Sequence, residues 1–192
     1  MRDTGLCEVL NPSEMLLSER PEDAPGSAVV CTIEGSRPIL AEIQALVAPS
    51  GFGIPRRMTS GYDISRLNLL IAVLEKRVGL KMADQDVYVN VIGGLKVDEP
   101  AADLSLLAAI VSSLKSMNIP KEMVFLGEVG LTGEVRSISN AQKRVSESLK
   151  MGFTEIILPK ENAKGIDIKS QGVHLHPVKN IREALTYLIN NC

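Results

Sequence analysis

From residue 86 to the end of the chain, segments with the spacing of strands alternate with segments with the spacing of helices. The clearest strand is 86–92, in which Val87, Val89 and Val91 share one face because strand side chains point alternately to two sides. The other expected elements are a helix at 100–116, strands at 123–128 and 134–137, a helix at 139–151, strands at 154–158 and 173–178, and a helix from Asn180 onward. Such alternation predicts an α/β fold in which helices pack on a sheet.

The first half of the chain adds a hairpin and one strongly apolar helix. Segments 27–33 and 39–47 are rich in strand-forming residues and are separated by a turn, so we expect an antiparallel pair. A helix is expected to begin after Asp63, which can cap it, and to end at Gly79. Its apolar residues lie nearly all round the helix, which predicts that it is mostly buried.

Length and composition limit the possible classes of protein. The chain has 192 residues and 45% apolar residues, enough for one domain with a core of its own. Its net charge of -2 excludes a strongly basic protein that coats nucleic acid, although a local basic face remains possible. Aromatic residues are 3% of the chain, and tryptophan is absent, so a base-stacking platform is not expected.

The cysteines give no sign of a metal site or a disulfide framework. Cys7, Cys31 and Cys192 are far apart and form no C-x-x-C pair, which favours a reducing cytoplasm. No apolar run approaches the roughly 20 residues of a membrane-spanning helix, so we expect a cytoplasmic protein without membrane contact. Two histidines, His174 and His176, alternate along one expected strand and could bind a metal with a third ligand, although surface histidines are the simpler interpretation.

Small residues line one face of the expected helix at 100–116. Ala101, Ser105, Ala108, Ala109 and Ser112 lie at helical spacing and would let a backbone, another subunit or a ligand approach closely. Ser105 could be a nucleophile if a lysine with a lowered pKa acted as its base. The alternative is a structural serine that donates to the carbonyl oxygen of Ala101.

Five basic residues flank the first long helix, and they are Arg56, Arg57, Arg66, Lys76 and Arg77. They could contact the phosphates of DNA or an acidic patch on a neighbouring subunit. A solvated surface without a ligand is the competing interpretation.

A family resemblance extends over nearly the whole chain. It rests on the strings at 5–14, 18–21, 26–30, 42–47, 56–63, 90–94, 99–104 and 127–136. These strings resemble the region after the ATPase domain in the RadA (Sms) family of bacterial DNA-repair proteins. The resemblance implies a fold like the Lon peptidase domain, with two layers, a mixed sheet and about four main helices. It also implies that residues 1–25 are a connector with a short helix from a missing ATPase domain, and that residues 26–192 are the Lon-like domain.

The same resemblance implies partners and cofactors. Proteins of this family act as hexameric, ATP-driven DNA motors in repair and recombination, so self-association and DNA contact are expected of this domain. The family's ATPase and its four-cysteine zinc finger require a phosphate loop and C-x-x-C pairs, which this sequence does not contain. ATP and zinc are therefore expected only in other parts of the parent protein, with no cofactor in this domain.

Lon peptidases use a Ser-Lys dyad, and the resemblance places both members. The motif Pro-Lys-Asp-Gly-Pro-Ser-Ala-Gly matches residues 100–107, with Ser105 at the nucleophile. The motif Gly-Gly-Leu-Lys-Glu-Lys matches residues 139–144, with Gln142 at the lysine. Glutamine cannot accept a proton from serine, and the neighbouring Lys143 points about 100° away on a helix. We therefore predict a non-catalytic assembly and DNA-contact domain. The alternative is an active peptidase with Ser105 as nucleophile and Lys143 as its shifted base.

Overall fold

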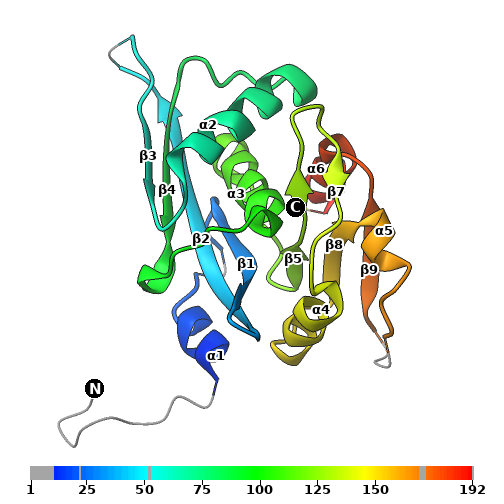
Figure 1. The fold of residues 1–192 in the computed structure, drawn as a ribbon. Coiled ribbons are helices and arrows are strands. Elements are labelled where there is room, and N and C mark those ends of the chain that lie inside the picture. Colours follow the sequence, from blue (N-terminus) through cyan, green and yellow to red (C-terminus); the bar gives the residue numbers. More distant parts are fainter. Residues whose placement is uncertain (1–10, 22, 52, 169–171, 192) are drawn as a thin grey trace, which may run out of the picture.

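The computed structural model describes residues 11–21, 23–51, 53–168 and 172–191 (Figure 1). Its elements, in chain order, are α1 (Pro12–Leu17), β1 (Ser27–Glu34), β2 (Arg37–Pro49), β3 (Arg57–Ser60), α2 (Ile64–Val73), the π-helical turn η1 (Leu74–Val78), β4 (Gln85–Val91), the 3-10 turns η2 (Ile92–Gly94) and η3 (Pro100–Ala102), α3 (Asp103–Lys115), β5 (Met123–Phe125), β6 (Glu128–Val129), β7 (Val135–Arg136), α4 (Ala141–Lys150), β8 (Glu155–Pro159), α5 (Lys160–Ala163), β9 (His174–Val178) and α6 (Ile181–Asn190).

The first half of the chain forms a four-stranded mixed sheet with the order β1-β2-β4-β3. Strands β1 and β2 form the expected antiparallel hairpin, and its turn contains Gly35 in the left-handed conformation, with φ of 63°. Strand β4 runs antiparallel to β2, whereas the edge strand β3 runs parallel to β4. The predicted hairpin and the predicted strand at 86–92 are both confirmed.

Helices α2 and α3 cover one face of this sheet (Figure 1). As expected, Asp63 caps α2, because its carboxylate accepts from the backbone N–H of Arg66. Gly79 then ends the helical segment in the left-handed conformation, with φ of 87°. The prediction that this helix is mostly buried is wrong, because half of the α2 residues are exposed on the side away from the sheet. The first ten residues of α3 are all buried, and its apolar side chains join those of α2 and the valines of β4 in one core.

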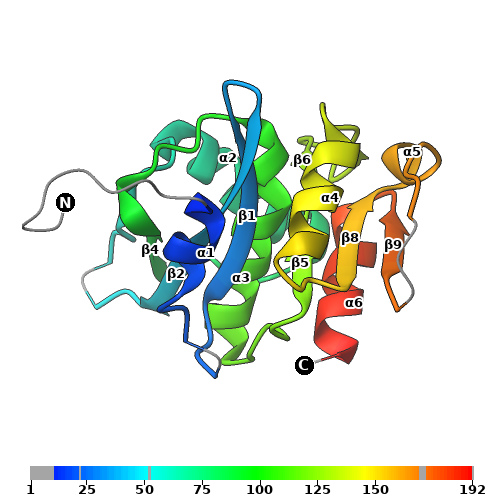
Figure 2. The same cartoon turned by 90° about the horizontal axis from the view of Figure 1, so that it is seen from below.

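The second half of the chain forms a parallel sheet with the order β5-β8-β9. Alternate residues of β8 enter different cores, because Ile157 packs with α6 whereas Ile156 and Leu158 pack with α4. Helices α4 and α6 therefore lie on opposite faces of this sheet (Figure 2). The predicted α/β fold, with a mixed sheet and four main helices, is confirmed.

One helix start differs from the prediction. The spacing of Ser139 and Gln142 indicates a capping box, but α4 begins at Ala141 after Asn140, whose φ is 54° and whose side chain makes no cap hydrogen bond. The side chain of Gln142 instead exchanges hydrogen bonds with the backbone of Asp167, a residue in a distant loop. A long-range contact has replaced the local one, so the predicted capping box is wrong.

Helix α1, in the segment expected to be a connector, is packed on the domain. Asn11 caps it by accepting from the backbone N–H groups of Ser13 and Glu14, as expected. The buried Ser13 hydroxyl accepts from the N–H of Leu40 in β2 at 3.1 Å and donates to Glu147 in α4 at 3.2 Å. Part of the expected connector, residues 1–10, lies outside the described residues. Within the described part of the chain, no helix has the length and apolarity to cross a membrane.

Candidate functional site

The start of α3 is held between backbone groups of the loop that follows β5. Gly127 donates from its N–H to the carbonyl oxygen of Ala101 at 3.0 Å, and its own carbonyl oxygen accepts from Leu104 at 3.1 Å. A Cβ at Gly127 would lie 2.9 Å from a methyl carbon of Val135, so the close approach requires glycine. This anchored helix start is where the resemblance to Lon peptidases places the nucleophile.

Ser105 lies in the first turn of α3 and has no access to solvent. Its hydroxyl donates to the carbonyl oxygen of Phe125 in β5 at 2.5 Å. The hydroxyl therefore joins a helix to a strand, as in the structural interpretation, but its acceptor is Phe125 rather than Ala101.

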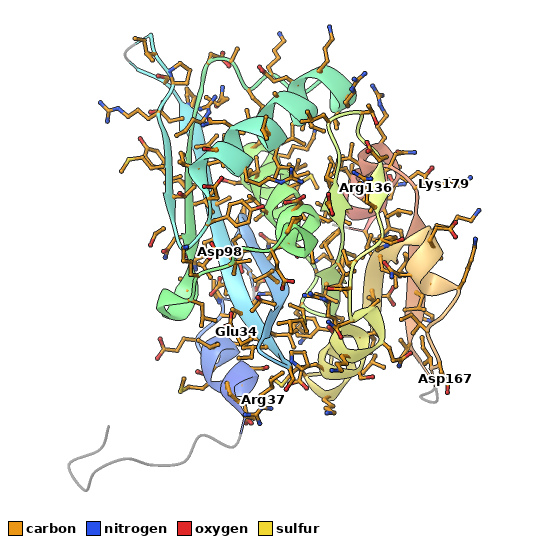
Figure 3. All side chains as sticks on the ribbon, in the orientation of Figure 1. Glu34, Arg37, Asp98, Arg136, Asp167 and Lys179 are labelled. Carbon is orange, nitrogen blue, oxygen red and sulfur yellow. The ribbon has the colours of Figure 1, made fainter. Side chains whose placement is uncertain are left out.

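Gln142 and Lys143 lie on the exposed side of α4. Lys143 lines a surface hollow together with Asn11, Pro12 and Arg37, and Arg37 is labelled beside α1 in Figure 3. Within the described part of the chain, the Lys143 ammonium makes no hydrogen bond or ion pair. The structure thus leaves Ser105 in the interior and Lys143 at the surface, and it does not bring together the two members of the alternative dyad.

The Lon motif can also be aligned from its second proline. Its final residues Pro-Ser-Ala-Gly then align without a gap with Pro100, Ala101, Ala102 and Asp103, of which the proline and the second alanine are identical, and Ala101 takes the place of the serine. Ala101 belongs to the same apolar cluster as Ala141 and Val145, so it packs near the start of the helix that carries Gln142. The sequence feature that indicates this alignment is Pro100, which takes the place of the second proline of the motif.

A buried ion pair lies beside Ala101. The fully buried Arg144 guanidinium donates to both carboxylate oxygens of Glu99, at 2.8 and 2.5 Å. It also donates to the carbonyl oxygens of Cys31 in β1 and Ser139. Burial alone would raise the pKa of Glu99, but the hydrogen bonds and charge of Arg144 hold it below its usual value. The Glu99–Arg144 ion pair therefore joins α4, β1 and the segment just before α3.

The Arg66 side chain makes its hydrogen bonds and its salt bridge within the protein. Its guanidinium forms a salt bridge with Asp103, whose side chain is fully buried at the start of α3. It also donates to the carbonyl oxygen of Val129 at 2.8 Å. The Asp103 carboxylate accepts further hydrogen bonds from the hydroxyl of Tyr62 at 2.7 Å and the backbone N–H of Val129 at 2.9 Å. The Arg66 side chain holds α2, α3 and β6 together, which differs from its expected place in a DNA-contact surface.

The other four predicted DNA-contact residues fall into two places. Arg57 is half-buried, and its guanidinium donates to the carbonyl oxygens of Arg56, Met82 and Gln85, so it fixes the loop before β4. Arg56 is exposed nearby, and its backbone N–H donates to Asp86 at 2.7 Å.

Lys76 and Arg77 are exposed at the end of the α2–η1 segment. They line a hollow of about 330 Å³ together with Thr132, Gly133 and Arg182. Arg182, from the first turn of α6, is a basic residue at this place that sequence reasoning did not name. The structure brings it beside two residues that lie more than a hundred positions earlier in the chain.

The small residues of α3 serve the interior. Ala108, Ala109 and Ser112 are fully buried. The Ser112 hydroxyl accepts from the N–H of Gly26 at 2.8 Å and donates to the carbonyl oxygen of Met117. The stripe lets α3 approach β1 and β2 of its own chain, so its predicted use as a subunit contact is wrong.

The two histidines share one carboxylate on the second sheet. His174 Nδ1 lies 2.7 Å from one oxygen of Glu155, and His176 Nε2 lies 2.6 Å from the other. The hydroxyl of Tyr187 donates to Glu155 at 2.9 Å. Burial alone would raise the pKa of Glu155, but these hydrogen bonds lower it to about 2. No cluster of three or more metal-ligating side chains that could hold an ion occurs within the described ranges.

This cluster predicts a pH dependence of stability. Because the folded-state pKa of Glu155 lies below its ordinary value of 4.5, the ionised carboxylate stabilises the fold above pH 4.5, and this contribution is lost as the pH falls toward 2. We expect Glu155→Gln to flatten the fall of the unfolding free energy over this range, as measured by urea unfolding at a series of pH values. The control Glu19→Gln, at an exposed side chain, should keep the slope of the unchanged chain. An unaltered slope in Glu155→Gln would contradict the prediction.

Comparisons with known proteins show the family of this chain. A family model described as the Lon protease (S16) C-terminal proteolytic domain matches residues 72–191, which include α3 and α4. The DNA repair protein RadA of Bacillus subtilis (strain 168) is 50% identical over 185 residues, which are 96% of this chain and 40% of that protein. The DNA repair protein RadA of Streptococcus pneumoniae (strain ATCC BAA-255 / R6) is 47% identical over 185 residues, which are 96% of this chain and 44% of that protein. The chain thus spans less than half the length of these curated relatives.

Proposed function

Since the chain belongs to the family of the Lon protease (S16) C-terminal proteolytic domain, we propose that it is a platform for assembly and DNA contact that has no usable Ser-Lys dyad and is not catalytic. The parent protein would be a DNA-repair protein of the RadA type, to which the similar proteins of Bacillus and Streptococcus belong by name. In this proposal the platform supports a hexameric, ATP-driven motor, and ATP and zinc are bound by other parts of the parent protein.

The observation that carries the non-catalytic role is the state of the two dyad positions. In the alignment from the second proline the nucleophile position holds Ala101, which has no hydroxyl, and the base position holds Gln142, which cannot accept a proton. The neighbouring Glu99–Arg144 pair joins β1 to α4 through hydrogen bonds within the protein. No contact within the described residues favours the alternative peptidase.

The DNA-contact role is supported by the basic hollow at the end of the α2–η1 segment. Lys76, Arg77 and Arg182 converge on it from two helical segments. The only hydrogen bond to protein from the three side chains, within the described ranges, joins Arg77 Nε to the carbonyl oxygen of Leu131 at 3.2 Å. Three neighbouring cations repel one another, and a phosphate of the DNA backbone would relieve this repulsion.

The test is the salt dependence of DNA binding. We expect the triple variant Lys76→Gln, Arg77→Gln and Arg182→Gln to weaken binding to duplex DNA and to reduce the slope of log K against log salt by up to about 3, because each lost phosphate contact removes about 0.9. Fluorescence anisotropy between low and moderate salt measures both quantities.

A matched control removes three exposed positive charges elsewhere on the molecule. Arg37→Gln, Lys121→Gln and Lys160→Gln give the same change of net charge without altering the hollow. The control should keep the slope of the unchanged chain. Equal losses in both triple variants would mean that net charge alone governs binding, and the proposed contact site would be rejected.

A further inference from the structure

One part of the first sheet presents apolar side chains to solvent on the face opposite α2 and α3. Leu46 of β2 is paired with Tyr88 of β4, and Tyr88 is paired with Met58 of β3, so the three side chains form a row across three strands. Leu46 and Met58 are 61% and 59% exposed. We call this row the outer sheet face. Helices α1 and α4 contact the other end of β2, around Leu40, and leave the row uncovered.

A hollow adjoins this row. It has a volume of about 340 Å³ and lies between the strands and the segment before β1, with Pro21, Pro25, Leu46 and Tyr88 in its lining. The outer sheet face is therefore concave at one side, which suits the insertion of a side chain from a partner.

Helix α2 presents a second surface without charge. Its exposed positions are Ile64, Ser65, Asn68, Leu69 and Ala72, and we call them the α2 outer face. An exposed helix normally carries charged residues on its solvent side. The opposite side of α2 packs toward the sheet through Leu67 and Leu70, in the same core as the inward-facing valines of β4. The α2 outer face and the outer sheet face consequently point in opposite directions (Figure 1).

We propose that the α2 outer face of one copy packs on the outer sheet face of the next copy. This inference rests on the assembly role proposed above and specifies its contact. The partner is a second copy because one chain carries both an apolar convex helix and an apolar concave sheet, and neither has a charge to desolvate. The outer sheet face is bordered by Arg56 and Asp86, and the α2 outer face by Asp63 and Lys76. Each border thus combines an acid with a base.

The symmetry of this contact follows from the use of two different surfaces. A contact between unlike surfaces is head-to-tail, and each added copy offers the next one the same free surface. Such a contact closes into a ring when the rotation between neighbours divides a full turn. A contact of one surface with itself would stop at a dimer.

The test uses one charge on each surface. Leu69→Asp disables the α2 outer face, and Met58→Asp disables the outer sheet face. Both side chains are exposed, so neither change disturbs the core. We expect the unchanged 192-residue chain to form species larger than a dimer at high concentration, as measured by sedimentation equilibrium. Each variant should lower the association constant at least about thirtyfold, the effect of losing a central contact residue.

The decisive measurement is the equimolar mixture of the two variants. Leu69→Asp keeps an intact outer sheet face, and Met58→Asp keeps an intact α2 outer face, so the mixture should form dimers and nothing larger. Ile189→Asp, at an exposed apolar position of α6 outside both surfaces, is the control and should assemble like the unchanged chain.

The outcomes separate this inference from the proposed function. A chain that stays monomeric at every concentration would overturn the assembly role and the contact together. Normal assembly by both variants would overturn the contact and leave the assembly role standing. Monomeric variants whose mixture is also monomeric would reject the head-to-tail pairing.

Discussion

Arg144→Ala is expected to destabilise the fold by about 3 kcal/mol, because it removes one partner of a largely buried ion pair and leaves the other uncompensated. The fully buried Arg144 guanidinium donates to both oxygens of Glu99 and to backbone carbonyl oxygens of Cys31 and Ser139. The Glu99 side chain is 26% exposed, so water can solvate it in part, and this keeps the expected cost near the lower end of the usual range. Urea unfolding followed by circular dichroism measures the change.

The neighbouring Lys143 provides the matched control. Lys143→Ala removes an equal charge from the same turn of α4, but this side chain is exposed, so we expect a change within about 0.5 kcal/mol. Arg144→Lys should recover little of the loss, since one ammonium cannot reproduce a two-pronged contact with a carboxylate. If Arg144→Ala unfolds at the same urea concentration as Lys143→Ala, the pair does not hold the two halves of the domain.

Asp103→Ala is expected to cost at least about 3 kcal/mol. The Asp103 carboxylate has no solvent exposure and accepts from the Tyr62 hydroxyl, the Arg66 guanidinium and the N–H of Val129. Alanine would leave a buried hydroxyl, a buried backbone donor and a partly buried cation without their acceptor, and each unsatisfied group adds to the cost. Thermal and urea unfolding should both show the loss.

Asp98 is the control for this second prediction. It pairs with Lys96 at the surface, where both side chains are more than half exposed, so Asp98→Ala should cost no more than about 1 kcal/mol. The double variant Asp103→Ala with Arg66→Ala should be less destabilised than the sum of the single variants, because both act on one contact. Additive losses would show that Asp103 and Arg66 act independently.

The sequence predicts those parts of the fold whose signals are local. The alternating valines of β4, the two ends of the helix at Asp63 and Gly79, and the turn at Gly35 all depend on neighbouring residues, and the structure confirms each. The predicted burial of that helix is wrong, because burial depends on what the rest of the chain packs against it. The start of α4 could not be predicted in this way, because Gln142 contacts Asp167 rather than its own helix. Strand β7 lies within the strand predicted at 134–137, whereas the single strand predicted at 123–128 is divided into β5 and the two-residue β6.

The candidate site depends on contacts between residues far apart in the sequence. Arg66 and Asp103 are 37 positions apart, and Glu99 and Arg144 are 45 apart. No periodic pattern connects such pairs, so Arg66 is indistinguishable in sequence from the exposed Arg77. The sequence shows which residues are basic, but only the folded structure shows whether a basic side chain is exposed to a ligand or forms an ion pair with a carboxylate of its own chain.

The strand order also limits how this chain can join others through its backbone. In the first sheet β1 packs against β5, which leaves β3, of four residues, as the open edge. In the second sheet β9 is an open edge of five residues, and it includes Pro177, which has no N–H to donate. Short or interrupted edges are poor templates for strand-to-strand growth and so protect against aggregation. Copies can therefore be held at high local concentration through side-chain contacts with little risk of uncontrolled sheet extension.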